Sequence, residues 1–246
     1  MIDLSTLNPN RKKALFLAQK QLPELVCDAV NLEGVNFTLP EIQTLLDGVT
    51  VGEHSLQDET IALNQVKAWR FLFDSVERDR FSLSEDFVCE LHGVLAQREA
   101  LTWGVFRDGG VTIAGSDYLP PSADTLPACW QQLMEKYKSA LLQSDLPQSE
   151  MHPPEIDIEQ TYTDAISIFL QMARTQFFYD ANKRLGRLMM NGVLLVCGLP
   201  AINLPAKKQL EFNQLMLGFY SSNDEQPMQI FMRACLEKKF LEIMSV

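Results

Sequence analysis

The residues that could do chemistry gather in one segment, 176–187, which reads QFFYDANKRLGR. Lys183, Arg184 and Arg187 are cations that can hold oxyanions, and the two arginines are spaced to share one face of a helix. A helix that begins at Asn182 would add unpaired N–H groups at the positive end of its dipole. Asp180, just before that helix, could hold a magnesium ion that bridges to phosphates. The spacing makes a phosphate cradle plausible, although spacing alone favours an ordinary capped helix with a solvated basic first turn.

This segment lies between two predicted helices, 157–175 and 182–197, and apolar residues recur at helical spacing over most of the chain. Pro23 perturbs the first of the other helices, Thr38 and Glu41 form a capping box, and Pro227 lies in the first turn of the last helix. The other helices are predicted at 11–30, from 38 to just before 48, and at 58–76, 85–97, 123–143, 206–220 and 226–244. The fold class is therefore mainly α.

The apolar period changes to that of a strand only at 102–114. The stretches 102–107 and 111–114 flank the Gly-rich turn Asp108-Gly109-Gly110, which predicts one small β-hairpin. A hairpin alone is marginally stable, so we expect this one to pack on the helices.

Composition and charge restrict the class of protein. The chain has 246 residues, 46% of them hydrophobic, a formal net charge of −11 and a sequence pI near 4.8. This composition is globular, and the acidic balance argues against a general DNA or RNA binder. The apolar run at 188–199 is too short to cross a membrane, and residues 1–13 lack the apolar core of a signal peptide, so we expect a cytoplasmic protein without a membrane partner. The connector at 144–154 is too short to mark a boundary, which predicts one domain over 1–246.

Segment 176–187 resembles the signature of the Fic (Fido) family, H-x-F-x-[D/E]-G-N-[G/K]-R-x-x-R. Other family landmarks follow in order: an inhibitory-helix signature that ends at Glu33-Gly34, a flap-like stretch at 104–115, and residues near 152, 191, 198–200 and 223–231. The resemblance runs from about residue 25 to about residue 235. It implies a single Fic-like helical domain, with an inhibitory-helix-like region at 1–50 and a core at 58–244, in which the predicted hairpin is the flap.

The resemblance also implies a nucleotide. Fic proteins bind ATP with magnesium, and most known members transfer AMP to a hydroxyl side chain of a target protein. The magnesium role falls on Asp180, the γ-phosphate role on Arg187, and the inhibitory role on Glu33, which would pair with Arg187. The implied nucleotide- and phosphate-binding residues are Asn182, Lys183, Arg184, Gly186 and Arg187. The flap residues expected to dock a target segment by strand addition are Val111, Thr112 and Ile113. Family members are often dimers, so a homodimer remains an alternative to a monomer.

The chain departs from the signature at the residue that carries the reaction. Gln176 stands where the family has the histidine that takes the proton from the attacking hydroxyl, and a Gln amide accepts no proton at working pH. Ala181 replaces a glycine of the turn, and Ala29 replaces the Ser or Thr of the inhibitory signature. These departures favour a Fic-like protein that still binds nucleotide but is catalytically impaired. Two alternatives stay open: a transferase that uses another base, and a protein-interaction scaffold without nucleotide.

Overall fold

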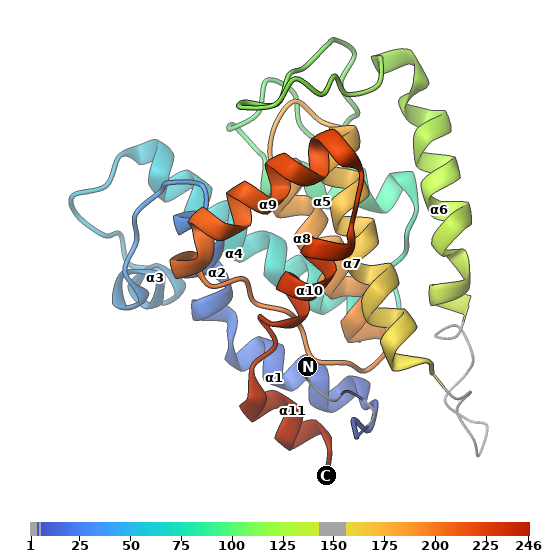
Figure 1. Cartoon of the computed structure of the whole chain (residues 1–246). Helices are drawn as coiled ribbons and strands as arrows, with labels where there is room; N and C mark the ends of the chain where they lie inside the picture. The colour runs from blue at the N-terminus through green and yellow to red at the C-terminus, as the bar shows by residue number, and fades with distance from the viewer. Residues whose placement is uncertain (1–3, 5, 143–155) are drawn as a thin grey trace.

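The computed structural model describes residues 4, 6–142 and 156–246, and all regular elements in these residues are helical (Figure 1). The α-helices are α1 (Arg11–Lys20), α2 (Leu22–Asn31), α3 (Leu39–Leu46), α4 (Leu56–Glu77), α5 (Glu85–Leu95), α6 (Leu126–Leu142), α7 (Ile158–Thr175), α8 (Asn182–Val196), α9 (Gln209–Ser222), α10 (Gln226–Arg233) and α11 (Lys238–Met244). Short 3-10 turns at Ala123–Thr125 and Ala206–Lys208 lead into α6 and α9. The predicted mainly α fold class is confirmed for this part of the chain.

The sequence also predicts a connector at 144–154 and a chain without a membrane-spanning segment. The connector predicted at 144–154, including the landmark at 152–153, lies outside the described residues. None of the described helices has the length and apolar character needed to cross a bilayer.

Helix starts follow the capping chemistry of the sequence. The Thr38 hydroxyl accepts from the N–H of Glu41, and the Thr38 N–H donates to Glu41 Oε2 at 2.7 Å, which completes the predicted capping box of α3. At α5 the Ser84 hydroxyl accepts from the N–H of Phe87 at 3.1 Å. These side chains satisfy N–H groups that have no partner inside their own helix.

Two of the predicted helices are interrupted. Segment 11–30 divides into α1 and α2 at Gln21, whose N–H bonds back to Leu17 and Ala18, and Pro23 then takes the first turn of α2, where no N–H is required. Segment 226–244 divides into α10 and α11, with 234–237 between them. The side chain of Gln21 donates to the carboxylate of Glu237, so the two interruptions lie against each other.

Helices α7 and α8 pack side by side at the centre of the molecule (Figure 1). Gly186 permits their close approach, because a Cβ at this position would lie 3.0 Å from the carbonyl oxygen of Phe169. Helices α4 and α5 pack against α8, α6 and α10 pack against α7, and α2 packs on α4. The turn that joins α7 to α8 is therefore held from several sides, and this turn contains most of segment 176–187.

The prediction of a β-hairpin at 102–114 is wrong, since the structure has no strand among the residues it describes. Some backbone groups that a hairpin would pair with each other have other partners. The N–H of Arg107 donates to the carbonyl of Phe177 at 3.0 Å, and its buried guanidinium donates to the carbonyls of Gln176 and Gly109 at 2.6 Å each, and to that of Pro121. Segment 102–122 is therefore an irregular loop that is tied to the turn between α7 and α8.

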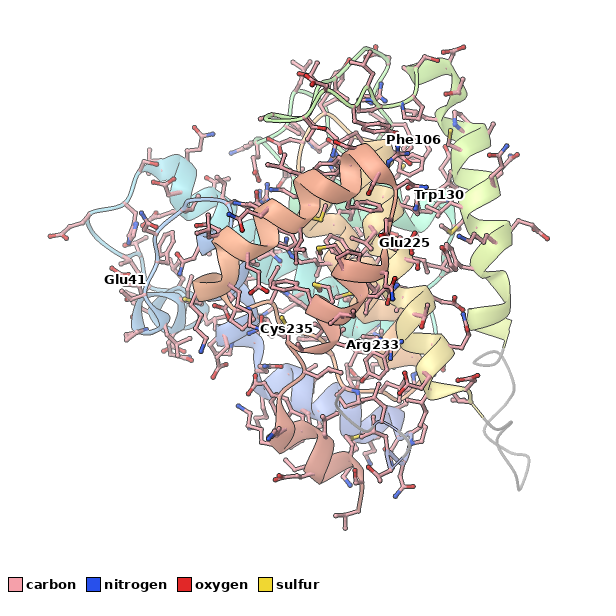
Figure 2. All side chains as sticks on the ribbon, viewed as in Figure 1. Glu41, Phe106, Trp130, Glu225, Arg233 and Cys235 are labelled. Carbon is pink, nitrogen blue, oxygen red and sulfur yellow. The ribbon has the colours of Figure 1, made fainter. Side chains whose placement is uncertain are left out.

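Aromatic packing anchors this loop to the helices. Phe106 lies near Trp130 of α6 (Figure 2), with ring centroids 5.9 Å apart, and its ring centroid is 5.1 Å from that of Phe177, which follows α7. Phe177 and Trp130 also meet edge to face at 5.2 Å. The expectation that this segment packs on the helices holds, although it forms no strand.

Candidate functional site

The turn between α7 and α8 bends through two residues with left-handed backbone. Gln176 ends α7 with φ 54° and ψ 63°, and Ala181 precedes α8 with φ 59°. A residue with a Cβ is strained in this region, so Ala181 occupies a conformation that glycine would adopt at lower cost. No side chain caps the start of α8, which leaves the positive end of this buried helix without a side-chain acceptor.

Asn182 holds the turn together from inside. Its Oδ1 accepts from the N–H of Phe178 at 3.0 Å, and its Nδ2 donates to the carbonyl of Phe178 at 2.7 Å and to Gln176 Oε1 at 3.0 Å. The side chain is buried. The structure thus places the Asn182 amide against its own turn, so a contact with phosphate would come through the backbone of this residue or after the amide is released.

Gln176 is half-buried and both ends of its amide have partners. Nε2 donates to the carbonyl of Ala173 at 2.6 Å, and Oε1 accepts from Asn182. The residue therefore caps the end of α7 and fixes Asn182, and it offers no group that can take up a proton.

Asp180 is the exposed member of the turn. One carboxylate oxygen accepts from the N–H of Ala181 at 2.6 Å. Within the described residues no group of three or more His, Cys, Asp or Glu side chains could hold a metal, so Asp180 stands as a single carboxylate rather than part of a complete metal site.

Glu33 lies beside Arg187 of α8, as the resemblance implies, and also beside Lys183. Its two oxygens are 3.4 Å from Lys183 Nζ and 3.5 Å from Arg187 Nη2. Burial by itself would raise the pKa of Glu33, but the charges of Lys183, Arg187 and Arg184 outweigh it and the pKa is lowered. Glu33 is therefore a carboxylate that occupies the position an anion would take beside Arg187.

Arg184 has a different partner, which sequence reasoning did not find. It forms a two-pronged ion pair with Glu99, a residue just after α5, and the two side chains are only 3% and 8% exposed. Burial lowers the pKa of Arg184, but Glu99 more than offsets this and the net pKa is raised. Although Arg184 and Arg187 both line the space behind α8, they do not converge on one anion, because each is held by a separate carboxylate.

The remaining predicted site residues lie at the edges of this arrangement. Gly186 faces Phe169 of α7, so its role in the structure is close helix packing. In the loop at 102–122, Thr112 is exposed while Val111 and Ile113 are half-buried. The loop is tied to the turn a second time, because the Tyr179 hydroxyl donates to Asp108 at 2.6 Å.

His92 of α5 is a second residue that sequence reasoning missed, because nothing in its spacing connects it to the turn. Its Nδ1 accepts from the N–H of Gly104 at 3.0 Å, which leaves the proton on Nε2, and Nε2 donates to the carbonyl of Asp180 at 3.3 Å. The ring is fully buried and stacks on Phe178 with centroids 3.8 Å apart. Burial, helped by the charge of Arg184, lowers the pKa of His92 to about 4 despite the bond to Asp180. The neutral ring thus joins α5, the loop and the turn.

Comparison with known proteins gives a family match for part of the chain. Residues 82–194 match the model of the Fic/DOC family. Curated relatives include the proteins named protein adenylyltransferase Fic of Drosophila mojavensis and Drosophila willistoni, which are 23% and 24% identical to this chain over 236 residues. Each match covers 95% of this chain and 42% of the relative, so the chain spans less than half the length of these proteins.

Solved structures share the fold. The crystal structure of a Fic domain containing signaling protein from Bacteroides thetaiotaomicron superposes with a TM-score of 0.75 at 20% identity, over 98% of this chain and 92% of that one. Fic-1 from C. elegans gives a TM-score of 0.71 at 18% identity, over 95% of this chain and 65% of that one. At these identities the likeness establishes the arrangement of helices.

Proposed function

Since residues 82–194 of this chain belong to the Fic/DOC family, we propose that it binds the phosphates of ATP with magnesium at the turn between α7 and α8, and that its transfer of AMP is impaired. The family gives the reaction class, because its curated relatives are named protein adenylyltransferases. The observation that carries the impairment is Gln176, an amide bonded to Ala173 and Asn182 at the position of the family's base. General-base catalysis contributes about 10²–10⁴-fold, so its loss leaves at most a slow reaction.

The residues of the turn fit a magnesium–nucleotide pair. Asp180 is exposed and stands alone, which suits magnesium, because this ion commonly takes one or two carboxylates and completes its shell with phosphate oxygens and water. The start of α8 has no side-chain cap and can accept an anion. When bound, magnesium would neutralise phosphate charge; Asp180 would hold it, and Lys183 and Arg187 would contact the phosphates.

The described residues offer no obvious replacement for the base. His92 is near the turn, but it is fully buried, both ring nitrogens have partners, and its pKa is lowered to about 4. His54 lies elsewhere, stacked on Phe37 with centroids 3.8 Å apart. A transferase with another base is therefore the weaker proposal. Docking of a target at 111–113 by strand addition would require this irregular loop to pair as a strand with the target.

Glu33 is expected to compete with the nucleotide for Lys183 and Arg187. Calorimetric titration with ATP and magnesium should therefore show weak binding to the wild-type protein and at least about tenfold tighter binding to Glu33→Gly, the gain of removing a competing carboxylate. Adding Arg187→Ala to that variant should abolish the gain. Asp47→Gly is the matched control, since Asp47 also precedes a glycine with positive φ at a helix end but does not face the site.

The absence of heat in both the wild-type protein and Glu33→Gly would contradict nucleotide binding. If ATP binds, Gln176→His in the Glu33→Gly background should raise transfer of labelled AMP to the protein or a surrogate hydroxyl peptide by about 10²–10⁴-fold. A rate unchanged by this substitution would show that the missing base is not what limits the reaction.

A scaffold without nucleotide is the second candidate, and the ion pairs favour it. Arg184 is fully engaged by Glu99, and Arg187 lies against Glu33, so both motif arginines have structural roles without a ligand. In this case Arg187→Ala would lower the free energy of unfolding, while ATP would raise the melting temperature of neither the wild-type protein nor Glu33→Gly.

A further inference from the structure

The ion pair between Glu33 and Arg187 is loose. Glu33 Oε1 lies 3.5 Å from Arg187 Nη2 and has no hydrogen-bond partner among the described residues. Glu33 directly follows the last turn of α2, and Gly34, with φ 83°, ends that turn. The place of the carboxylate beside α8 therefore depends on what holds the end of α2.

Segment 202–209, which leads from α8 into the first residue of α9, holds the end of α2. The side chain of Gln209 donates to the carbonyls of Asn31 and Leu32 at 3.3 and 2.9 Å. The last carbonyls of a helix have no partner from a following turn, so they are free to accept such a donor. The Gln209 amide thus ties the residues just before Glu33 to α9.

The same segment also holds α2 one turn earlier, at Asp28. Asp28 Oδ2 accepts from Asn203 Nδ2 at 2.6 Å, and Oδ1 accepts from the N–H of Ala206 at 2.8 Å. Hydrogen bonds to an ionised acceptor are stronger than those between neutral groups. Since Asn203 is itself buried, this attachment fixes α2 to the segment at a second point.

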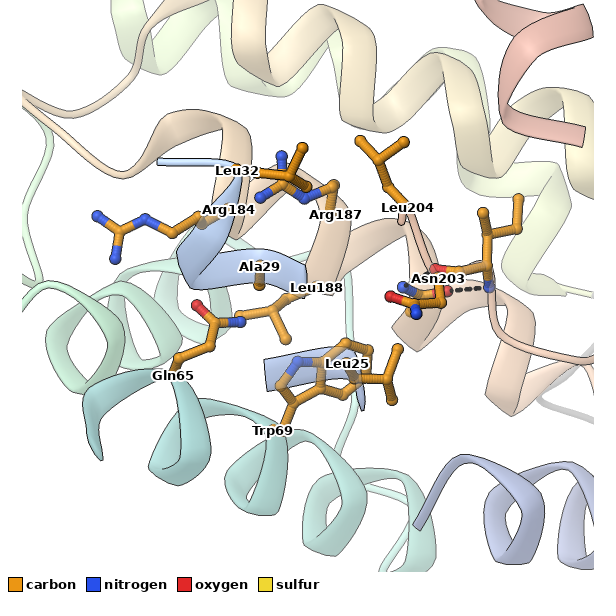
Figure 3. Close-up of a pocket in the computed structure, with 12 residues that line it drawn as sticks. Leu25, Ala29, Leu32, Gln65, Trp69, Arg184, Arg187, Leu188, Asn203 and Leu204 are labelled. Carbon is orange, nitrogen blue, oxygen red and sulfur yellow. Dashed lines mark hydrogen bonds between the residues drawn. The ribbon is translucent and has the colours of Figure 1, made fainter. Parts of the chain in front are cut away.

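The other end of the segment is fixed to α8. Asn191, a buried residue of α8, accepts from the N–H of Ile202 at 2.8 Å and donates to its carbonyl at 3.1 Å. Leu32 of α2, Arg187 of α8 and Leu204 of the segment line one small space (Figure 3). Contacts therefore run from α8 through the segment to α2, and return to α8 through the ion pair.

We propose that Gln209 is a positioning residue for Glu33, and that Asp28 is the second point at which α2 is attached. Together they keep the carboxylate of Glu33 on Lys183 and Arg187, so weakening either attachment would free these cations for another anion more often. The hold on α2 is a property of the protein without ligand. Its effect on ATP rests on the proposed function.

Hydrogen exchange tests the hold on α2 directly. The N–H groups of Gly34 and Val35 donate to carbonyls of α2 at 3.0 and 3.1 Å, so they exchange when this helix end opens. Gln209→Ala, and likewise Asp28→Asn, should make their exchange about fivefold faster, the effect of losing one hydrogen bond. Unchanged rates in Gln209→Ala would overturn the proposal.

Gln229→Ala is the matched control for this measurement. Gln229 is also half-buried, and its Nε2 donates to a helix carbonyl, that of Thr163 at 2.9 Å, but it joins α10 to α7. The exchange of Gly34 and Val35 should not change in this variant. Equal acceleration in Gln229→Ala and Gln209→Ala would show a general loss of stability and would refute the specific hold.

Calorimetric titration with ATP and magnesium tests whether the hold acts through Glu33. Gln209→Ala leaves the net charge unchanged and should bind ATP about fivefold more tightly than the wild-type protein, but no more tightly than Glu33→Gly. Added to Glu33→Gly, it should change the affinity by less than about twofold, because no carboxylate remains to be positioned.

The outcomes separate this proposal from nucleotide binding itself. A gain that persists in the double variant, or no gain from Gln209→Ala when Glu33→Gly binds tightly, would refute the positioning role. If ATP binds neither the wild-type protein nor Glu33→Gly, nucleotide binding is contradicted, and the exchange of Gly34 and Val35 alone decides whether Gln209 holds α2.

Discussion

We expect the protein to lose stability between pH 7 and pH 5, because His92 must stay neutral in the folded state. Its Nδ1 accepts the N–H of Gly104, a bond that the protonated ring cannot make, and burial lowers the pKa of His92 to about 4. In the unfolded chain the pKa is about 6.5. The folded state binds the proton less well than the unfolded state, so stability is complete above the unfolded pKa and declines as the pH falls toward the folded pKa. These two pKa values give a loss of about 2 kcal/mol from pH 7 to pH 5 and about 3 kcal/mol by pH 4.

Urea unfolding at pH 7 and pH 5 measures this loss. His92→Asn should be less stable than the wild-type protein at pH 7, because it loses the stack on Phe178, but it should lack the drop of about 2 kcal/mol. His54→Asn removes another histidine and leaves His92 in place, so it should retain the drop. Carboxylates whose pKa values are lowered, such as those of Glu33 and Asp108, lose their charge at more acidic pH and do not produce a loss above pH 5. An equal drop in the wild-type protein and in His92→Asn would refute the reasoning.

Further substitutions test the contacts around the turn. Glu99→Gln leaves the buried charge of Arg184 without its carboxylate and should lower the free energy of unfolding by about 3–5 kcal/mol in urea, whereas Glu99→Leu combined with Arg184→Met should recover most of this loss. Ala181→Gly removes the strain of a left-handed alanine and should stabilise the protein by about 1 kcal/mol in the same assay; a destabilised variant would show that the site is unstrained. Arg107→Ala removes donors to three carbonyls, so limited proteolysis should cut 104–121 faster than in the wild-type protein, and unchanged cleavage would show that the loop is held by other contacts.

Much of the fold follows from local sequence signals. The capping box of Thr38 and Glu41 is encoded within four residues of its helix start and is observed as predicted, and the cap at Ser84 is equally local. The hairpin prediction failed because of contacts with residues far away in the sequence. A Gly-rich turn between β-forming stretches normally pairs with itself, but Arg107 and the carbonyls of the α7–α8 turn compete for the same backbone groups. No spacing rule within 102–114 reveals that partner.

The candidate site was likewise predictable only in part. The resemblance placed Glu33 beside Arg187, and the structure brings them to 3.5 Å. Glu99 and His92 could not be found from sequence, because each meets the turn from across more than eighty residues of chain. The orientation of the Asn182 side chain also could not be predicted. An amide at the start of a helix can face a ligand or its own turn, and the sequence does not distinguish the two.

The packing of Gly186 against Phe169 has a consequence for how signatures of this kind should be interpreted. A side chain at Gly186 would push α7 and α8 apart, and replacing Phe178 or Asn182 would open the buried turn, whether or not any reaction takes place there. Natural selection for a folded chain would therefore remove changes at these positions even after the chemistry had lapsed. The side chain of Asp180 is exposed and packs in no core, so in a sequence of this type this position reports on the reaction, while the buried positions of the signature report on the architecture as well.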